Sequence, residues 1–354
     1  MRYILLLFLA ASLVAAPKSP ADRGAKFLVS KQAKDGSWVQ HPAITALCIM
    51  GIDSSGIDAK AAIDRGLAYV LSFRQKNGAI YPATRDMTSS ANYPNYTTSV
   101  GLLMLAQLNR PEHHEIMRAA RRYLQDSQFA DSAKIDYGGI GYGKTGRADL
   151  SNGSWAAEAL HASAYLDGEG SARADTMWRN LGSFLSKCQN LPETNKEDFV
   201  STHPDDRGGF FYRPHESKAG EQEGEHSGLI SSGSMTYAGL MSMLHARLDR
   251  QDPRVKAALH YLRGHWTVDE NPGMGPQGLF YYLHIMTKAL AAVGDAKLLD
   301  ADGVAHDWRA EVRAKLLGMQ AADGSWANAH GRYMESMPEL ATSYALITLK
   351  HLAK

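Results

Sequence analysis

The sequence predicts an all-α protein, an (α/α)6 toroid in which six helical hairpins with Gly-rich, Trp-containing turns stack into one ring. Two observations predict it: a short motif occurs six times, and an apolar segment long enough for a helix follows each copy. In the motif an aromatic residue and an aliphatic residue are followed by a polar residue at the fifth step, and the copies at 69 and 261 match it more loosely. The copies begin at residues 27, 69, 123, 184, 261 and 315. A single hairpin cannot bury both of its faces, so the hairpins must stack along the whole chain.

The first and last copies are the most alike. Residues 27–38 and 316–326 each contain a Gln and end in Asp-Gly-Ser-Trp. The Gly adopts the helix-ending conformation that other residues resist, and the Trp can pack on the neighbouring hairpin while its indole N–H finds a partner. We therefore expect a first helix that ends near the Gln and a second helix after the turn. The expected second helices are residues 43–50, 98–108, 154–166, 234–248, 278–293 and 340–352.

A family resemblance accompanies this pattern. Residues 23–38, Arg-Gly-x-x-Phe-Leu-x3-Gln-x3-Gly-Ser-Trp, resemble the glutamine–tryptophan repeat of squalene and hopene cyclases. The six hairpins resemble the wider terpenoid cyclase and protein prenyltransferase α/α-toroid superfamily, over about residues 22–352. The resemblance implies a toroid with a ligand site at its central cavity. Squalene cyclases of that family have two such barrels, whereas this chain has enough repeats for one.

The motifs that carry the family's chemistry are missing. The cyclase motif D-x-D-D is absent, and its nearest approach, Asp205-Asp206, has His203 where the first Asp should stand. The zinc prenyltransferase motif D-x-C is absent too, because neither Cys48 nor Cys188 has an Asp two residues before it. The resemblance therefore implies neither a zinc prenyltransferase nor a bound metal, and we expect no cofactor.

The N-terminus has the pattern of a secretory signal. Arg2 is followed by an apolar run at residues 4–9 and small residues at 14–16. The apolar stretch is shorter than the roughly 20 residues that span a bilayer. We expect a cleaved signal peptide at residues 1–16, an exported protein that is periplasmic or extracellular, and no integral membrane domain after cleavage.

The remaining chain divides into a lead-in at residues 17–26 and one toroid domain at 27–354, with an inserted loop at about 190–232. The loop is rich in carboxylates and has four interpretations: a lid, a disordered segment, an ion site or a solvated charge run.

Composition limits the classes of partner. The chain has 38 Lys and Arg against 37 Asp and Glu, and 44% of its residues are hydrophobic. These values exclude a disordered chain, a polycationic nucleic-acid binder and a multi-span membrane protein. No nucleic-acid partner is expected. Cys48 and Cys188 fall on opposite sides of the predicted ring, so we expect both to be unpaired, buried and inert.

Alignment of the six second helices gives a first pair of candidate catalytic residues. A small polar residue recurs at the first turn, at Thr45, Thr98, Ser154, Thr236 and Thr342, and helix capping explains this column. Four residues later most helices have an apolar residue, but the third and fifth have Glu158 and His284. A carboxylate and an imidazole facing one cavity could perform general acid–base chemistry. The alternative is two buried polar residues with structural partners.

The turn at residues 268–275 gives a second pair, Asp269 and Glu270, beside an aromatic helix. Paired carboxylates at the mouth of a toroid could protonate or deprotonate a ligand, whereas helix capping and tyrosine packing are the alternative. The predicted catalytic residues are therefore Asp269, Glu270, Glu158 and His284. The predicted ligand-binding residues are Tyr281, Tyr282, Gln277, Tyr237 and Trp155.

Three functions remain open. The leading hypothesis is a toroid that binds an apolar or amphipathic, isoprenoid-like ligand, with or without cyclase-like acid–base chemistry. The second is a carbohydrate-active enzyme with a glycan partner, because such barrels also host glycosidases and lyases. The third is a binding scaffold without chemistry. A lumen lined by Tyr, Trp, Met and Leu favours the first, an open groove with two carboxylates the second, and a collapsed lumen the third.

Overall fold

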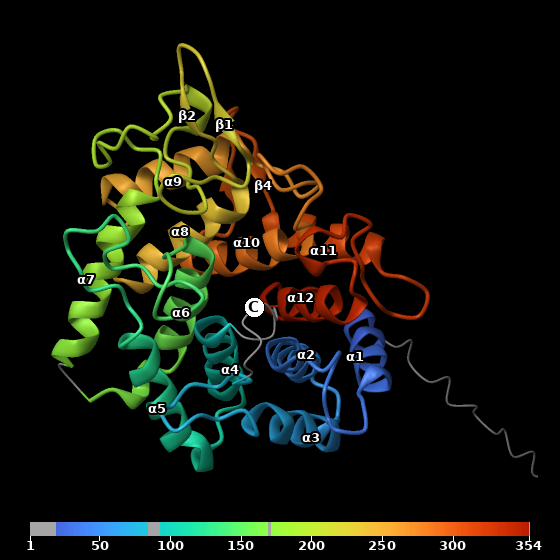
Figure 1. The fold of residues 1–354 in the computed structure, drawn as a ribbon. Coiled ribbons are helices and arrows are strands. Elements are labelled where there is room, and N and C mark those ends of the chain that lie inside the picture. The colour runs from blue at the N-terminus through green and yellow to red at the C-terminus, as the bar shows by residue number, and fades with distance from the viewer. Residues whose placement is uncertain (1–18, 84–92, 169–170, 354) are drawn as a thin grey trace, which may run out of the picture.

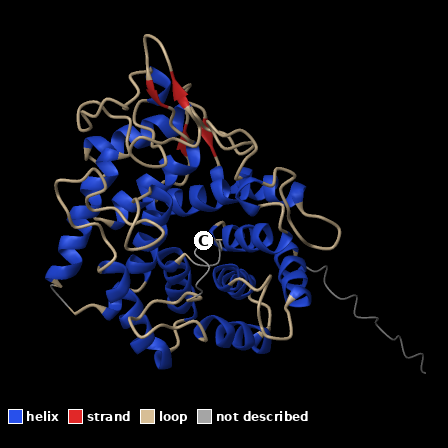
Figure 2. Ribbon diagram, viewed as in Figure 1, coloured by secondary structure: helices blue, strands red, loops and turns tan. Residues whose placement is uncertain are grey.

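The structure, a computed structural model, describes residues 19–83, 93–168 and 171–353. The predicted signal segment at residues 1–16 lies outside these ranges. Helices dominate the described chain, as Figure 2 shows, which confirms the all-α prediction. The α-helices are α1 Pro20–Lys31, α2 Pro42–Ser55, α3 Lys60–Leu71, α4 Pro94–Leu108, α5 His114–Gln125, α6 Leu150–Ala162, α7 Ala172–Lys187, α8 Gly233–His245, α9 Pro253–Gly264, α10 Leu279–Val293, α11 Trp308–Met319 and α12 Pro338–His351.

Strands are few and short. In one antiparallel hairpin β1 (Glu221–Gln222) pairs with β2 (Gly228–Leu229), and in another β3 (Leu298–Leu299) pairs with β4 (Ala305–His306). Single 3₁₀ turns at Pro111–His113, Ala164–Leu166, Pro204–Asp206 and Arg332–Met334 lie between the longer helices. None of these elements interrupts the helical layers.

The even-numbered helices form an inner circuit. Contacts run from α2 to α4, α6, α8, α10 and α12, and α12 packs in turn on α2. The odd-numbered helices lie outside this circuit (Figure 1). The six predicted second helices correspond to the inner helices, which begin within about four residues of the predicted starts. The core lies between the two layers and along the inner circuit.

Sequence explains why the layers differ. Inner helices are buried on nearly all sides, as in α2, where every residue from Pro42 to Ile52 is buried. A helix that is apolar all round needs partners on all sides. Outer helices bury one stripe only, such as Met117, Ala120 and Leu124 in α5. The pattern alternates along the chain and produces two layers.

Glutamine side chains join the outer helices. The carboxamide of Gln32 donates to the carbonyl oxygen of Gly36 in its own turn, at 3.0 Å, and to that of Ala62 in α3, at 2.8 Å. The same pair of bonds is made by Gln128, Gln189 and Gln320, which reach α7, α9 and α1. Each amide thus fixes a glycine turn and attaches it to the next outer helix.

The tryptophans of the two Asp-Gly-Ser-Trp turns are fully buried. The indole of Trp326 donates to the carbonyl oxygen of Leu316 at 2.7 Å, and Trp38 makes the equivalent bond to Leu28. The ring of Trp326 also packs so closely on α1 that a Cβ added at Gly24 would lie 2.7 Å from it. The predicted indole partner and the packing on a neighbouring hairpin are both present.

The column of threonines is structural. Each hydroxyl oxygen accepts a hydrogen bond of 2.9–3.0 Å from the backbone N–H of the preceding turn. The pairs are Thr45 with Trp38, Thr98 with Ile80, Thr236 with Phe210 and Thr342 with Trp326. These bonds position the turns on the inner helices.

The inserted loop at 190–232 is held by a buried carboxylate. Asp206 accepts hydrogen bonds from the backbone N–H of Ser231 at 2.7 Å, the hydroxyl of Ser201 at 2.8 Å and the amide of Gln222. Because Asp206 is occupied in this way, it is a structural anchor of the loop. Within the described ranges, no three His, Cys, Asp or Glu side chains are placed to share a metal ion.

Both cysteines are buried and unpaired, as predicted. Burial raises the pKa of both thiols well above the usual range, which keeps them protonated.

No helix in the described ranges is both long and apolar enough to cross a membrane.

Candidate functional site

A cavity of about 250 Å³ lies at the N-terminal halves of the inner helices. Every inner helix contributes to its wall: Ile44 of α2, Tyr96 of α4, Trp155 of α6, Met235 of α8, Tyr281 of α10 and Tyr344 of α12. Its volume is just below the range of about 300–1,000 Å³ that is usual for small-molecule sites. The packing of all six inner helices therefore forms the cavity.

Four of these side chains form an aromatic box, here defined as Tyr96, Trp155, Tyr281 and Tyr344. Ring centroids are 6.1 Å apart for Tyr96 and Trp155, 6.4 Å for Trp155 and Tyr281, and 6.1 Å for Tyr281 and Tyr344. The hydroxyls of Tyr344 and Tyr96 interact and complete the circuit. Because the rings come from four helices, the box depends on the packing of the inner circuit.

His284 lies against the aromatic box. Its ring stacks on Trp155 with centroids 5.8 Å apart and lies 5.1 Å from the ring of Tyr344. Only 1% of His284 is exposed, and neither ring nitrogen has a hydrogen-bond partner among the described residues. Burial, with a contribution from nearby Lys288, holds the pKa of His284 well below its ordinary value. The imidazole is therefore neutral at physiological pH.

Glu158 lies on the same side of the box, in a buried ion pair. Its carboxylate is 2.6 Å from the ammonium of Lys288, one turn beyond His284 on α10. That ammonium also lies 5.6 Å from the ring centroid of Trp155. Glu158 and His284 thus lie in one region beside Lys288, and neither of them lines the cavity.

Two further carboxylates border the cavity. Glu335 is fully buried and accepts hydrogen bonds from the backbone N–H groups of Phe280 and Tyr281, at 3.2 and 2.7 Å, and from the amide of Asn328 at 2.9 Å. It therefore caps α10, whose own N-cap residue is a glycine. Burial raises the pKa of Glu335, although these hydrogen bonds oppose the shift.

Asp149 is the second of these carboxylates and caps α6. The backbone and side-chain N–H groups of Asn152 each donate to it at 2.8 Å, and the hydroxyl of Tyr212 interacts with it. Burial raises the pKa of Asp149 to about 6 in spite of these contacts. Asn152 and Tyr212 line the cavity, so this carboxylate lies directly behind its wall.

The chain is similar in fold to solved structures at low sequence identity. No protein-family model and no curated protein matches the chain. A solved protein from Actinoplanes is 15% identical, with a TM-score of 0.52, over 95% of this chain and 99% of its own. The type II terpene cyclase MstE from Scytonema, in its apo form, is 12% identical, with a TM-score of 0.52, over 94% of this chain and 96% of its own. The chain has a terpenoid cyclase-like fold.

In this cyclase-like fold the second predicted acid pair lies away from the cavity. Asp269 has a side chain that is 78% exposed and pairs with Lys315 of α11 at 2.8 Å. Glu270 is exposed as well, and neither residue lines the cavity. The loop places both carboxylates on the outer side of α10, so they do not meet Glu158 or His284.

The predicted ligand-binding residues separate into two groups. Trp155 and Tyr281 are walls of the aromatic box. Tyr282 is buried and donates from its hydroxyl to the carbonyl oxygen of Thr267 at 2.8 Å, and its ring lies 5.8 Å from that of buried Tyr237. The side chain of Gln277 accepts a bond from Arg332. These last three residues have structural contacts and do not line the cavity.

Sequence reasoning missed Tyr96, Tyr344, Glu335 and Asp149. Tyr96 lies two residues before Thr98, and Tyr344 lies two residues after Thr342. The helical periodicity around these threonines could therefore have indicated that both tyrosines face the cavity. Glu335 lies in a loop and reaches α10 from 54 and 55 residues away. No local pattern reveals such a contact.

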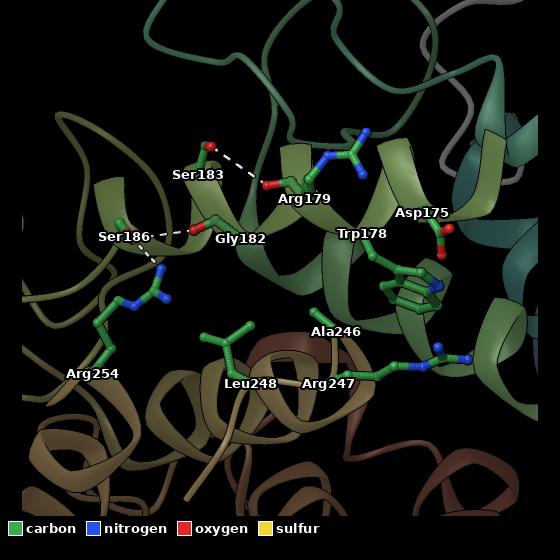
Figure 3. Close-up of a pocket in the computed structure, with 10 residues that line it drawn as sticks. All are labelled: Asp175, Trp178, Arg179, Gly182, Ser183, Ser186, Ala246, Arg247, Leu248 and Arg254. Carbon is green, nitrogen blue, oxygen red and sulfur yellow. Dashed lines mark hydrogen bonds between the residues drawn. The ribbon is translucent and has the colours of Figure 1, made fainter. Parts of the chain in front are cut away.

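A larger groove of about 620 Å³ lies on the outer surface of the cyclase-like fold, between α7 and the segment after α8. Figure 3 shows Trp178 of α7 facing Arg247, whereas Arg179 points away. Arg254 at the other end is bound to Asp252 at 2.7 Å and to Ser186 at 3.0 Å. Since the groove has one aromatic residue, Trp178, in its lining, whereas the central cavity has an aromatic wall, the central cavity is the better candidate site.

Proposed function

We propose that the protein binds an apolar or amphipathic, isoprenoid-like small molecule in its central cavity. We also propose that the inner and outer helices form an (α/α)6 toroid of six hairpin repeats around that cavity. The observation that carries the proposal is the wall itself. It includes seven tyrosines, Trp155, three methionines, Leu340 and Ile44. Clefts lined by aromatic and apolar groups with a few polar groups are typical of small-molecule sites.

The lining supports this function over the two alternatives considered from sequence. A collapsed lumen, which would favour an empty scaffold, disagrees with a cavity of about 250 Å³. A carbohydrate-active enzyme needs two free carboxylates across an open groove. Here Glu335 and Asp149 cap helices and Glu158 is paired with Lys288.

The fold supports an isoprenoid-like ligand without supplying the chemistry. The Scytonema protein of similar fold is a type II terpene cyclase. Because this chain lacks the D-x-D-D acid and its cavity carboxylates have structural partners, we propose a binding protein first. If turnover occurs, Glu158 and His284 are the proposed acid–base pair, because they lie beside the box while Asp269 and Glu270 face solvent.

Export remains part of the proposal. We propose that residues 1–16 are a cleaved signal peptide and that the mature protein acts in the periplasm or outside the cell. A ligand of low water solubility would then be bound outside the cytoplasm. N-terminal sequencing of the protein purified from its host, with a start after residue 16 expected, tests this point.

The binding proposal is tested with farnesol as probe, by calorimetric titration of the full mature chain. We expect saturable binding, and a Kd at least tenfold higher for Tyr281→Ala, which opens the box. The matched control is Tyr165→Ala, which removes an exposed tyrosine that does not line the cavity. It should bind as the wild type does.

Native mass spectrometry of protein from its own host provides a second test. A co-purifying isoprenoid or similar lipid is expected. Farnesol that does not bind, together with saturable binding of an oligosaccharide from a glycan panel, would overturn the proposal. Equal loss of farnesol binding in Tyr281→Ala and Tyr165→Ala would place the ligand elsewhere.

A further inference from the structure

The electrostatics of the aromatic box say more about the ligand than its shape does. This inference rests on the proposed function, because it assigns the class of amphipathic molecule that the cavity takes. The faces of Tyr and Trp rings carry partial negative charge. Four such rings line one part of the cavity, and three successive pairs have centroids 6.1–6.4 Å apart. Aromatic walls of this kind attract cations.

Carboxylates near the cavity exceed the cations that could neutralise them. Glu335 and Asp149 belong to no ion pair within the described ranges; their hydrogen-bond partners are amides and a tyrosine hydroxyl. Lys288 is paired with Glu158, and Lys218 at the wall shares Glu216 with Arg213, which also attracts Asp149. These four carboxylates face three cations. A cation brought by a ligand would therefore compensate the buried carboxylate of Glu335.

The same walls distinguish between kinds of cation. A primary ammonium has three N–H donors and needs acceptors for them. The oxygens of Glu335 and Asp149 are already used by the helix ends that they cap, and the buried wall oxygens without a partner among the described residues are those of the Asn152 amide and the Tyr281 hydroxyl. Two neutral oxygens are fewer than the three acceptors that a primary ammonium needs. A methylated ammonium has few or no donors and is bound by ring faces alone, so the box suits a methylated nitrogen better than an amine.

We propose that the aromatic box binds the quaternary ammonium group of an amphipathic ligand whose apolar part fills the rest of the cavity. Trp155 provides the largest wall, and Tyr96, Tyr281 and Tyr344 provide the others. Glu335 and Asp149 supply long-range attraction without contacting the methyl groups. Lys288 opposes a cation near Trp155, and its pairing with Glu158 limits that repulsion.

The experiment compares two ligands that differ only in charge. Choline and its carbon isostere 3,3-dimethylbutan-1-ol have the same shape, so a difference in Kd reports the cationic contribution. Calorimetric titration of the full mature chain should give a Kd at least tenfold lower for choline. Ethanolamine, the primary amine, should bind more weakly than choline. The methyl protons of bound choline should shift upfield in NMR because of the surrounding rings.

Variants connect the preference to the box. Trp155→Leu should abolish the difference between choline and its isostere. Tyr344→Phe keeps the ring face and should preserve it. An unchanged far-UV circular dichroism spectrum of Trp155→Leu shows that the first variant is folded. Tyr165→Ala is the control outside the cavity and should behave as wild type.

Two outcomes would overturn the inference. One is equal affinity for choline and the isostere, and the other is tighter binding of ethanolamine than of choline. If farnesol still binds in either case, the cavity proposal stands and only the cationic preference fails. If farnesol also fails to bind, the proposed function fails as well.

Discussion

The carboxamide of Gln320 donates a hydrogen bond to the carbonyl oxygen of Pro20, 2.9 Å away, although 300 residues separate the two in the chain. The same amide group holds Gly324 in its turn. Two backbone carbonyls from opposite ends of the protein thus share one donor. Gln320 therefore makes the same kind of contact across the chain ends as Gln32 makes within the N-terminal region.

Replacement of Gln320 should weaken the contact between its glycine turn and α1. We expect Gln320→Leu to lower the free energy of unfolding by about 1–3 kcal/mol, because two partly buried carbonyl acceptors lose their donor. Urea denaturation measures the change. The control Gln251→Leu lies on the surface and should stay within about 0.5 kcal/mol of wild type. Equal effects of both substitutions would contradict the role assigned to Gln320.

The Glu158–Lys288 pair should behave as a buried ion pair. Lys288→Met leaves the carboxylate of Glu158 without a counter-charge, and we expect a loss of about 3–5 kcal/mol. The double variant Glu158→Gln with Lys288→Met removes both charges and should recover most of that loss. A double-mutant cycle by thermal or urea unfolding measures the coupling. Additive losses would show that the two side chains do not depend on each other.

Asp149 should make stability fall as the pH rises. Its pKa in the folded protein is about 6, above the ordinary value of 3.8, mainly because it is buried. The folded state therefore keeps a proton that the unfolded chain releases between about pH 4 and pH 6, and deprotonation favours unfolding. The contribution lost across that interval is about 2–3 kcal/mol.

The variant Asp149→Asn isolates this contribution, because Asn also caps helices and does not titrate. Unfolding free energies of the two proteins are compared at several pH values. The stability of wild type relative to the variant should decline from pH 4 to pH 7. A constant or rising difference would show that the carboxylate is not destabilised by burial.

Glu335 should control the first turn of α10. Glu335→Ala removes the acceptor of the Phe280 and Tyr281 amides, so their hydrogen exchange should accelerate by about tenfold or more, equivalent to roughly 1.4 kcal/mol. Glu335→Gln keeps an acceptor oxygen and should protect both amides better than Ala. Similar exchange in the two variants would indicate that the cap adds little.

Hairpin periodicity made most of the fold predictable. The inner helices, the Gly turns and the indole partners follow from local patterns, because each depends on contacts within one hairpin or with the next. Hydrophobic phase also indicated that Glu158 and His284 face the interior. It could not reveal Lys288 as the partner of Glu158, because that pair joins α6 to α10 across 130 residues.

The remaining site residues could not be predicted either, because they too are brought together by contacts between distant parts of the chain. The four rings of the aromatic box belong to different hairpins, and no pairwise motif connects them. Asp269 and Glu270 stand beside an aromatic helix in sequence, yet the loop turns them to the outside, where Lys315 pairs with Asp269. Residues that adjoin a cavity-lining helix in sequence can therefore lie away from the cavity when the loop that carries them turns outward.

α12 contacts both α1 and α2, so the proposed stack of hairpins has no terminal unit. An open solenoid exposes two ends, and its outermost units fray first because each has one neighbour. In the proposed toroid every hairpin has two neighbours. Loss of any one hairpin removes two interfaces from the rest, so the protein should unfold in one concerted transition rather than by progressive unzipping from either end.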